Sequence, residues 1–286
     1  KLKSEGVSIL YISHKLEEIK ALCDHATILR LGKVVATCTP ANETARSMAE
    51  MMIGAELAMP SARDYQPGEV ALELSHLSLP SLDPFGTNLR DVSLSLRKGE
   101  VMGVGGVAGN GQDEFLLALS GERAVPAEMI KLKGAAIGNV PPEKRRAMGL
   151  LTAPEERLGH AAAPDMSLVD NAVLTGQTRR NLAKNGWLNM RKAASFADEI
   201  IARFDVRTPG NHVPARALSG GNLQKYVIGR EVLQSPDVLV VNQPTWGVDA
   251  AAAAAIRQAL RDLAAAGAAV LVVSQDLDEL MEMSDT

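Results

Sequence analysis

The sequence predicts an α/β protein. Two almost entirely apolar stretches, Val101–Val104 and Val238–Val241, indicate buried strands, and a further buried strand follows Gly267. Helical patterns lie between these strands, most clearly at Glu114–Ser120 and Ile256–Leu263. Strands that alternate with helices in this way are typical of an α/β domain.

Composition limits the possible functions. The chain has 286 residues, 46% of them hydrophobic and 22% charged, which is ordinary for a globular protein of one large or two smaller domains. A net charge of −4 argues against a nucleic-acid surface as the main function. Cys23, Cys38 and the histidines show no metal-ligand spacing, so no metal site made of protein ligands is expected.

An internal repeat predicts tandem domains. The segment 267–285 aligns without gaps on 6–24, and Gly, Leu, Ser, Leu, Glu and Asp recur at matching places. We therefore expect the tail of a first copy at 1–54, a linker at 55–68, and a second copy at 69–286 that is truncated at its C-terminus.

The first copy is expected to contain four elements. These are a buried strand at Val7–Ile12, a helix at Lys15–Asp24, a hairpin over 26–37, and a Met-rich helix at Thr44–Gly54.

The second copy adds two regions to its buried strands. Val70–Leu74 and Val92–Leu96 alternate apolar and polar residues, which predicts a small antiparallel sheet with one wet face. From Pro154 onward the pattern is mostly helical, and Trp187 and Phe196 are expected in its small core.

A glycine-rich turn follows the strand Val101–Val104. Gly106, Gly109 and Gly111 have the spacing of a Walker A loop, in which backbone N–H groups and a helix N-terminus bind phosphate. Such a loop continues with Lys and then Ser or Thr, which contact the β/γ-phosphates and Mg²⁺. Here Gln112 and Asp113 follow, so a charged hydrogen bond is lost and a carboxylate is added that repels phosphate unless it contacts the metal.

The stretch Ala217–Asp249 carries the most specific pattern. Leu218-Ser-Gly-Gly opens a helix that ends at Ser-Pro-Asp, and a buried strand and a polar turn follow. This order resembles the signature motif and Walker B segment of the ATP-binding cassette (ABC) family, and the signature matches at every position. The glycine spacing at 106–111 becomes a specific signal because this signature follows about 110 residues later.

The chain also departs from the family. The Walker B strand normally ends in Asp-Glu, but this chain has Asn242 and Gln243, and Gln275 stands where the switch histidine is expected. Asn242 cannot supply charge to Mg²⁺, and Gln243 can orient water but cannot take a proton. No glutamine occurs near 152–157, where the Q-loop should fall. Hydrolysis at this cassette's own Walker site is therefore expected to be poor or absent.

The resemblance implies how the site residues work. Cassettes of this family act as head-to-tail pairs, with ATP and Mg²⁺ between the Walker motifs of one and the signature of the other. His14 of the first copy would then be the switch histidine of a working site that Ser219, Gly220 and Gly221 complete. The implied catalytic residues are His14, Gln243 and Gln275, and the implied nucleotide contacts are Gly106, Val107, Ala108, Gly109, Asn110, Gly111, Gln112, Asp113, Leu218, Ser219, Gly220, Gly221, Asn242 and Asp249.

Across essentially the whole chain, the sequence is similar to fused double-cassette ATPases of bacterial importers for simple sugars and nucleosides. Supporting segments lie at 52–54, 86–93, 154–157, 165–171 and 218–225. Gln243-Pro-Thr resembles the nucleoside branch more than the ribose or galactose branch. The resemblance implies a P-loop NTPase fold with a mostly parallel sheet core, a small antiparallel β subdomain and a helical subdomain at about 154–215. It also implies transmembrane permease partners, an indirect solute-binding partner (periplasmic or a lipoprotein), no nucleic acid, and a peripheral location on the cytoplasmic face of the membrane.

Two other functions stay open. A soluble ABC ATPase of translation or repair is expected to have a long basic region between its cassettes, whereas the linker here is short and near neutral. A scaffold that only binds nucleotide or partners is the third possibility, and the residues before Lys1 would decide between it and an ATPase.

Two features allow two interpretations each. Phe85 could stack on adenine or simply pack. Residues 155–157 could contact the permease or form a solvated helix start.

Overall fold

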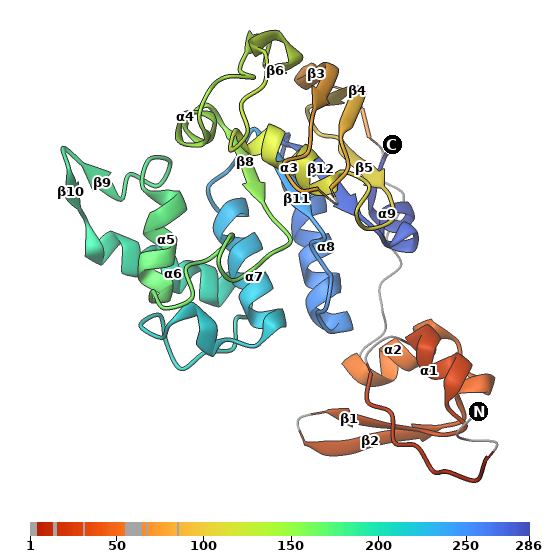
Figure 1. The fold of residues 1–286 in the computed structure, drawn as a ribbon. Coiled ribbons are helices and arrows are strands. Elements are labelled where there is room, and N and C mark those ends of the chain that lie inside the picture. The colour runs from red at the N-terminus through yellow and green to blue at the C-terminus, as the bar shows by residue number, and fades with distance from the viewer. Residues whose placement is uncertain (1–4, 14–15, 31, 55–64, 67, 85) are drawn as a thin grey trace. The chain divides into compact units, whose positions relative to one another are not determined.

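The structure is a computed structural model, and it describes residues 5–13, 16–30, 32–54, 65–66, 68–84 and 86–286 (Figure 1). The chain divides into two compact units. One contains residues 1–61 with 249–251, and the other contains residues 62–248 with 252–286. Each unit is described by itself.

The smaller unit contains a hairpin and short helices. Strands β1 (Ala26–Arg30) and β2 (Lys33–Cys38) pair antiparallel, which confirms the predicted hairpin. Helix α1 spans Leu16–Leu22, and a short 3-10 helix spans Pro40–Asn42. Helix α2 (Ala45–Ile53) is the predicted Met-rich helix.

Local sequence explains both ends of α2. The Thr44 side chain accepts from the Ser47 backbone N–H and the Ser47 side chain accepts from that of Thr44, so a capping box satisfies two free donors. Gly54 ends the helix in the left-handed conformation at φ 79°.

The predicted buried strand at 7–12 is wrong. These residues form no strand, and Leu10 and Ile12 are 91% and 89% exposed. A strand that is apolar on both faces needs neighbouring strands and covering helices. In the described part of this unit, the sheet contains only β1 and β2.

The larger unit is organised around a parallel sheet. Its four strands are β5 (Val101–Gly105), β12 (Ala269–Ser274), β11 (Val238–Asn242) and β8 (Leu150–Ala153), hydrogen-bonded in that order. All three pairings are parallel. Every residue of β11 and β12 is buried, as expected for strands covered on both faces.

A second, antiparallel sheet packs through helix α3 (Gln112–Ser120) onto one face of the parallel sheet. Its order is β4 (Leu89–Arg97), β3 (Val70–Leu79), β6 (Ile130–Leu132) and β7 (Ala135–Ala136). The two predicted alternating strands are therefore confirmed. A 3-10 helix (Ala127–Met129) precedes β6, and helix α4 (Pro142–Met148) precedes β8.

Helices cover the other face of the parallel sheet. Alternate residues of β11 and β12, such as Leu239, Val241 and Val270, share a core with Phe196 and Ile256. The helices are α5 (Leu168–Gly176), α6 (Met190–Arg203), α7 (Gly220–Val232) and α8 (Ala250–Ala265), with a 3-10 turn at Ala215–Ala217. Helix α9 (Leu277–Met283) follows β12.

The region after β8 differs in part from the prediction. Phe196 is 2% exposed, as predicted, but Trp187 is 82% exposed. Trp187 lies in a hairpin of β9 (Ala183–Lys184) and β10 (Trp187–Leu188) and not in the core. Residues 154–157 lie in a loop, so the predicted helix start there is also wrong. The first helix begins only at Leu168, because the Ser167 side chain caps its N-terminus.

Within the described residues, no helix is both long enough and apolar enough to cross a bilayer.

Candidate functional site

The carboxyl ends of the parallel strands bring most predicted site residues to one edge of the sheet. The loop at 106–111 follows β5, Gln275 follows β12, and Gln243 follows β11. The Gly106 N–H donates to the Ser274 carbonyl at 3.4 Å, which fixes the start of the loop against the neighbouring strand. Ligands of open α/β sheets bind at this edge.

The glycine-rich loop has backbone conformations that require glycine. Gly109 and Gly111 have φ values of 81° and 97°, in the left-handed region. A Cβ on Gly111 would also lie 3.0 Å from Leu89. The loop leads directly into α3, so the turn between strand and helix has the architecture of a phosphate-binding loop.

The side chain of Gln112 folds back over this loop. Its Nε2 donates to the Val107 carbonyl at 2.8 Å, and its Oε1 accepts from the Asn110 N–H at 2.9 Å. A Cβ on Gly106 would lie 2.9 Å from the same Nε2, so a side chain there would have to displace the Gln112 amide. One backbone donor of the loop is therefore satisfied by the protein itself.

Asn242 and Gln243 lie at the end of β11. Asn242 is 1% exposed, and neither atom of its amide has a hydrogen-bond partner among the described residues. Gln243 adopts φ 51°, unusual for a residue with a side chain. Its Oε1 accepts from the Gln275 N–H at 3.4 Å, which joins the ends of β11 and β12.

The signature segment starts helix α7. Ser219 is the N-cap and Gly220 and Gly221 form the first turn, while Leu218 ends the preceding 3-10 turn. The Ser219 hydroxyl accepts from Asn222 Nδ2 at 2.9 Å and does not cap a helix N–H. Ser219 and Gly220 are exposed, so the N-terminus of this helix can accept an anion from outside the cassette.

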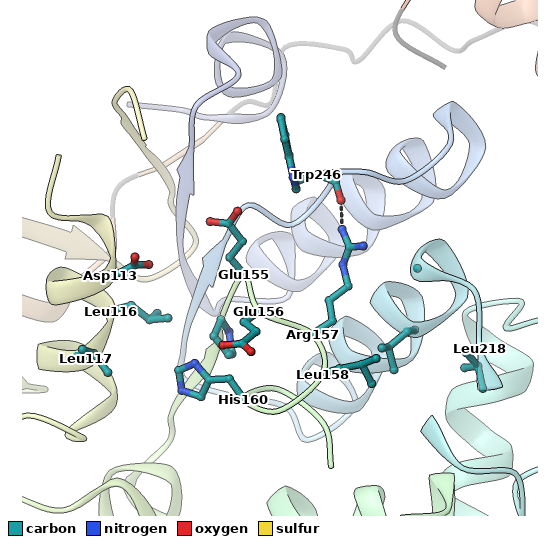
Figure 2. Close-up of a pocket in the computed structure, with 13 residues that line it drawn as sticks. Asp113, Leu116, Leu117, Glu155, Glu156, Arg157, Leu158, His160, Leu218 and Trp246 are labelled. Atoms are coloured by element: carbon teal, nitrogen blue, oxygen red, sulfur yellow. Dashed lines mark hydrogen bonds between the residues drawn. The ribbon is translucent and has the colours of Figure 1, made fainter. Parts of the chain in front are cut away.

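A pocket of about 730 Å³ lies beside the loop and the signature. Figure 2 shows residues from α3, from the loop after β8 and from α7 around it. It brings together Asp113, Leu218 and Gly220 of the predicted site residues. The lining is Asp113, Leu116, Leu117, Pro154, Glu155, Glu156, Arg157, Leu158, His160, Leu218, Gly220, Leu223 and Trp246.

Negative charge dominates one side of this pocket. Burial raises the pKa of Glu155, and the nearby Asp113 carboxylate raises it further. Arg157 lowers this pKa but does not outweigh them. The carboxylate that replaces the family's Ser or Thr thus lies close enough to Glu155 to affect its ionisation.

Arg157 links three segments of the site. Its Nε donates to Gln224 Oε1 at 2.9 Å, and its Nη2 donates to the Trp246 carbonyl, as Figure 2 shows. Gln224 is 1% exposed, and its Nε2 donates to the Pro244 carbonyl at 2.8 Å. Burial lowers the pKa of Arg157, while Glu155 raises it. Gln224 lies in the segment 218–225 that supported the resemblance, but its bridging role depends on contacts that spacing along the chain does not show.

The residues fit Mg²⁺ poorly and a nucleotide only in part. No group of three or more His, Cys, Asp or Glu side chains among the described residues could hold a metal ion. At the Walker B position, where the family has a carboxylate, this chain has the neutral Asn242. Its unpartnered amide can hold water but supplies no charge. For a nucleotide, the glycine loop keeps its shape, but Gln112 already accepts from one of its N–H groups.

Two of the predicted residues cannot be placed, and a third lies away from the pocket. His14 and Phe85 lie outside the described residues. Asp249 directly precedes α8 and does not line the pocket.

Known proteins match this chain over its whole length. It is 37% identical to the glucose import ATP-binding protein of Haloferax volcanii, over 100% of the chain and 52% of that protein. It is also 37% identical to the nucleoside import ATP-binding protein of Lactococcus lactis, over 99% of the chain and 56% of that protein. The chain thus spans about half the length of the curated relatives it matches.

Solved structures share the fold. A nucleotide-free ATP-binding cassette from an ABC transporter superposes with a TM-score of 0.60 at 19% identity, over 76% of this chain and 86% of the other. A dimeric post-hydrolysis cassette bound to ADP and Pi gives 0.59 at 18% identity, over 73% and 89%. The predicted ABC-type P-loop NTPase fold is confirmed.

A family model described as ABC transporter matches residues 89–246, more than half of the chain. This match includes the glycine loop, the pocket segment after β8 and the signature helix. The chain therefore belongs to the ABC transporter family.

Proposed function

We propose that this chain is part of the ATP-binding subunit of an importer for simple sugars or nucleosides. It would supply the end of a first cassette at 1–54, a linker at 55–68 and most of a second cassette at 69–286. The sequence repeat at an offset of 261 residues supports this division. The names of the relatives, which include glucose, nucleoside and ribose import ATP-binding proteins, support the substrate class.

The two nucleotide sites would have different roles. The observation that carries this proposal is the Gln112 side chain, which occupies the loop that would hold phosphate. A phosphate at this loop would have to displace two hydrogen bonds without gaining the charged lysine contact. It would also meet the Asp113 carboxylate. We infer that this cassette's own Walker site binds nucleotide weakly and hydrolyses it poorly.

The signature would serve the other site. Ser219 and Gly220 are exposed at the start of α7, where backbone N–H groups and the helix dipole favour the γ-phosphate of a neighbour's ATP. His14 of the first cassette would be the switch residue of that working site, which would take ATP and Mg²⁺.

Partners follow from this role. The subunit would associate peripherally with transmembrane permease subunits on the cytoplasmic face of the membrane. A solute-binding protein would act on the other side without touching it. The solute would be selected by those partners and not by this chain.

Paired substitutions in the full-length protein test the asymmetry. Ser219→Arg should reduce ATP turnover by about 100-fold or more, because it blocks the anion site at the helix N-terminus. Asn242→Ala, at the cassette's own Walker B position, should change turnover less than about threefold. Equal losses in the two variants would contradict the proposed division between a working and an impaired site.

A further inference from the structure

The hairpin between α5 and α6 projects from the helical part of the larger unit (Figure 1). Trp187 pairs with Lys184 across a two-residue turn, and both turn residues, Asn185 and Gly186, have positive φ values of 52° and 81°. This is the geometry of a tight type I′ hairpin turn. Its base is fixed, because the Asn189 N–H donates to the carbonyl of the buried Leu182 at 2.8 Å.

Large apolar side chains on this hairpin lie in solvent. Trp187 is 82% exposed, Leu188 52% and Met190 44%, and every residue from 184 to 192 is exposed. The hydrophobic core of the region is complete without them, since Phe196 and Leu182 fill it. An exposed Trp on a tight hairpin indicates a contact surface, because Trp combines a large apolar area with a polar N–H.

The charged residues of the sequence around this Trp are basic. Residues 171–197 contain five Lys and Arg and no Asp or Glu, in a chain whose net charge is −4. Arg179 and Arg180 bind backbone carbonyls after α7, and Arg180 also forms an ion pair with Glu199, so these two residues serve the packing of the region. Lys184, Arg191 and Lys192 are exposed, and none forms an ion pair with a described residue.

We propose that this hairpin, residues 184–192, binds the surface of an anionic phospholipid bilayer. Trp187 would lie at the level of the headgroups with Leu188 and Met190 beside it, and Lys184, Arg191 and Lys192 would face the lipid phosphates. Aromatic residues with an apolar body and a polar tip favour this interface, and nearby basic residues are attracted to anionic lipids. A protein partner would need a surface that is acidic, apolar and matched in shape to the hairpin. An anionic bilayer supplies the negative charge and the apolar region and needs no matching shape.

This contact is independent of the nucleotide chemistry proposed above. It would fix the orientation of the helical part against the membrane. Because Trp187 touches neither the loop at 106–113 nor the signature, its substitution should leave ATP turnover in detergent solution unchanged.

Vesicle flotation of the full-length protein tests the proposal. With vesicles of phosphatidylcholine and phosphatidylglycerol in roughly a 7:3 ratio, the protein should float, and with phosphatidylcholine alone it should not. Trp187→Ala should weaken binding about tenfold, and so should the triple change Lys184→Gln, Arg191→Gln and Lys192→Gln. Raising NaCl to about 0.5 M should release the protein, because charges at a surface are screened over a few ångströms.

Matched variants separate this hairpin from a general effect. Met281 is 85% exposed on α9, and Met281→Ala should float like the unmodified protein. Exchange of the exposed Arg90, Lys144 and Arg207 to Gln removes the same charge elsewhere and should also have no effect. Thermal unfolding would establish that every variant is folded.

Two results would overturn the proposal. One is that the protein does not float with anionic vesicles, or floats equally well after the Trp187 and triple substitutions. The other is that Trp187→Ala disrupts assembly with the permease in detergent but not flotation, which would assign the hairpin to a protein partner.

Discussion

Arg157 Nε donates a hydrogen bond to Gln224 Oε1 at 2.9 Å, which joins the loop after β8 to the signature helix. The other end of Gln224 donates to the Pro244 carbonyl, just beyond β11. One buried amide therefore joins the segments that carry the signature and the Walker B position. A shift of the signature helix would disturb both bonds.

Removal of this amide should destabilise the cassette. In Gln224→Ala, the partly buried Arg157 and the Pro244 carbonyl lose their partner, and we expect the free energy of unfolding to fall by about 1–3 kcal/mol. Urea unfolding would measure this. Gln258→Ala removes an exposed bond to Asp262 and should cost less than about 0.5 kcal/mol. An equal loss of unfolding free energy in the two variants would show that the Gln224 bridge stabilises the cassette no more than a surface hydrogen bond does.

Asp113 should control the ionisation of Glu155. Burial raises the pKa of Glu155 first, and the Asp113 carboxylate raises it further, so Asp113→Asn should lower it. The pKa of the Glu155 carboxyl can be followed by ¹³C NMR titration. Asp165→Asn, an exposed change elsewhere, is the control and should have no effect. An unchanged Glu155 pKa in Asp113→Asn would mean that the two carboxylates do not interact.

Glu231 should make stability depend on acid pH. Its carboxylate is fully buried, and burial alone would raise its pKa, but the guanidinium groups of Arg146 and Arg230 outweigh burial and hold the pKa below the usual 4.5. A depressed carboxylate contributes stability above the unfolded pKa and loses it as pH falls through the folded one. The stability gap between the unmodified protein and Glu231→Gln should therefore be large at neutral pH.

The same gap should shrink progressively below pH 4.5. Urea midpoints of both proteins, measured at neutral pH and in steps down to about pH 3, would show this. The control is Glu143→Gln, an exposed change at the start of α4, which should give a small and constant gap. A Glu231→Gln gap that grows in acid would reverse the sign and contradict the assignment.

Arg145 should be a major contributor to stability. It is fully buried, and its guanidinium donates to the carbonyls of Ala118, Leu119, Gly138 and Val140, which ties the end of α3 to the loop before α4. Burial lowers its pKa to about 10. We expect Arg145→Met to cost about 3 kcal/mol or more, because it removes four hydrogen bonds to backbone carbonyls, three of them buried.

Lysine should not rescue this position. Its ammonium is a compact group that cannot match the planar fork of Arg, so Arg145→Lys should remain well below the unmodified protein in unfolding free energy. Arg123, whose single bond joins it to the Pro80 carbonyl at the surface, is the matched control. A loss in Arg145→Met no larger than in Arg123→Met would contradict the structural role.

Much of the fold could be predicted because apolar pattern determines burial. The strands at 101–105, 238–242 and 269–274 are apolar on both faces, and the sheet is parallel and covered on both sides. The same reasoning failed at 7–12, because an apolar stretch forms a buried strand only where neighbouring strands and helices cover it. It failed at Trp187 because hydrophobicity does not distinguish a core residue from a contact residue.

The sequence predicted which segments of the chain form the site, but not the contacts between their side chains. The motifs located the loop, the signature and the strand ends, since each depends on spacing along the chain. The folding of Gln112 onto Val107 and the bridge from Arg157 to Gln224 depend on rotamers and long-range packing. Sequence spacing carries no information on either.

The number of nucleotides bound by the full-length protein tests the central claim most directly. Equilibrium dialysis with a non-hydrolysable ATP analogue and Mg²⁺, at concentrations that saturate ATP turnover, gives this number per chain. If Gln112 and Asp113 keep the loop at 106–113 from holding phosphate, the result should be one nucleotide per chain, and Ser219→Arg should bring it close to zero. Two nucleotides per chain, with one retained in Ser219→Arg, would contradict the account.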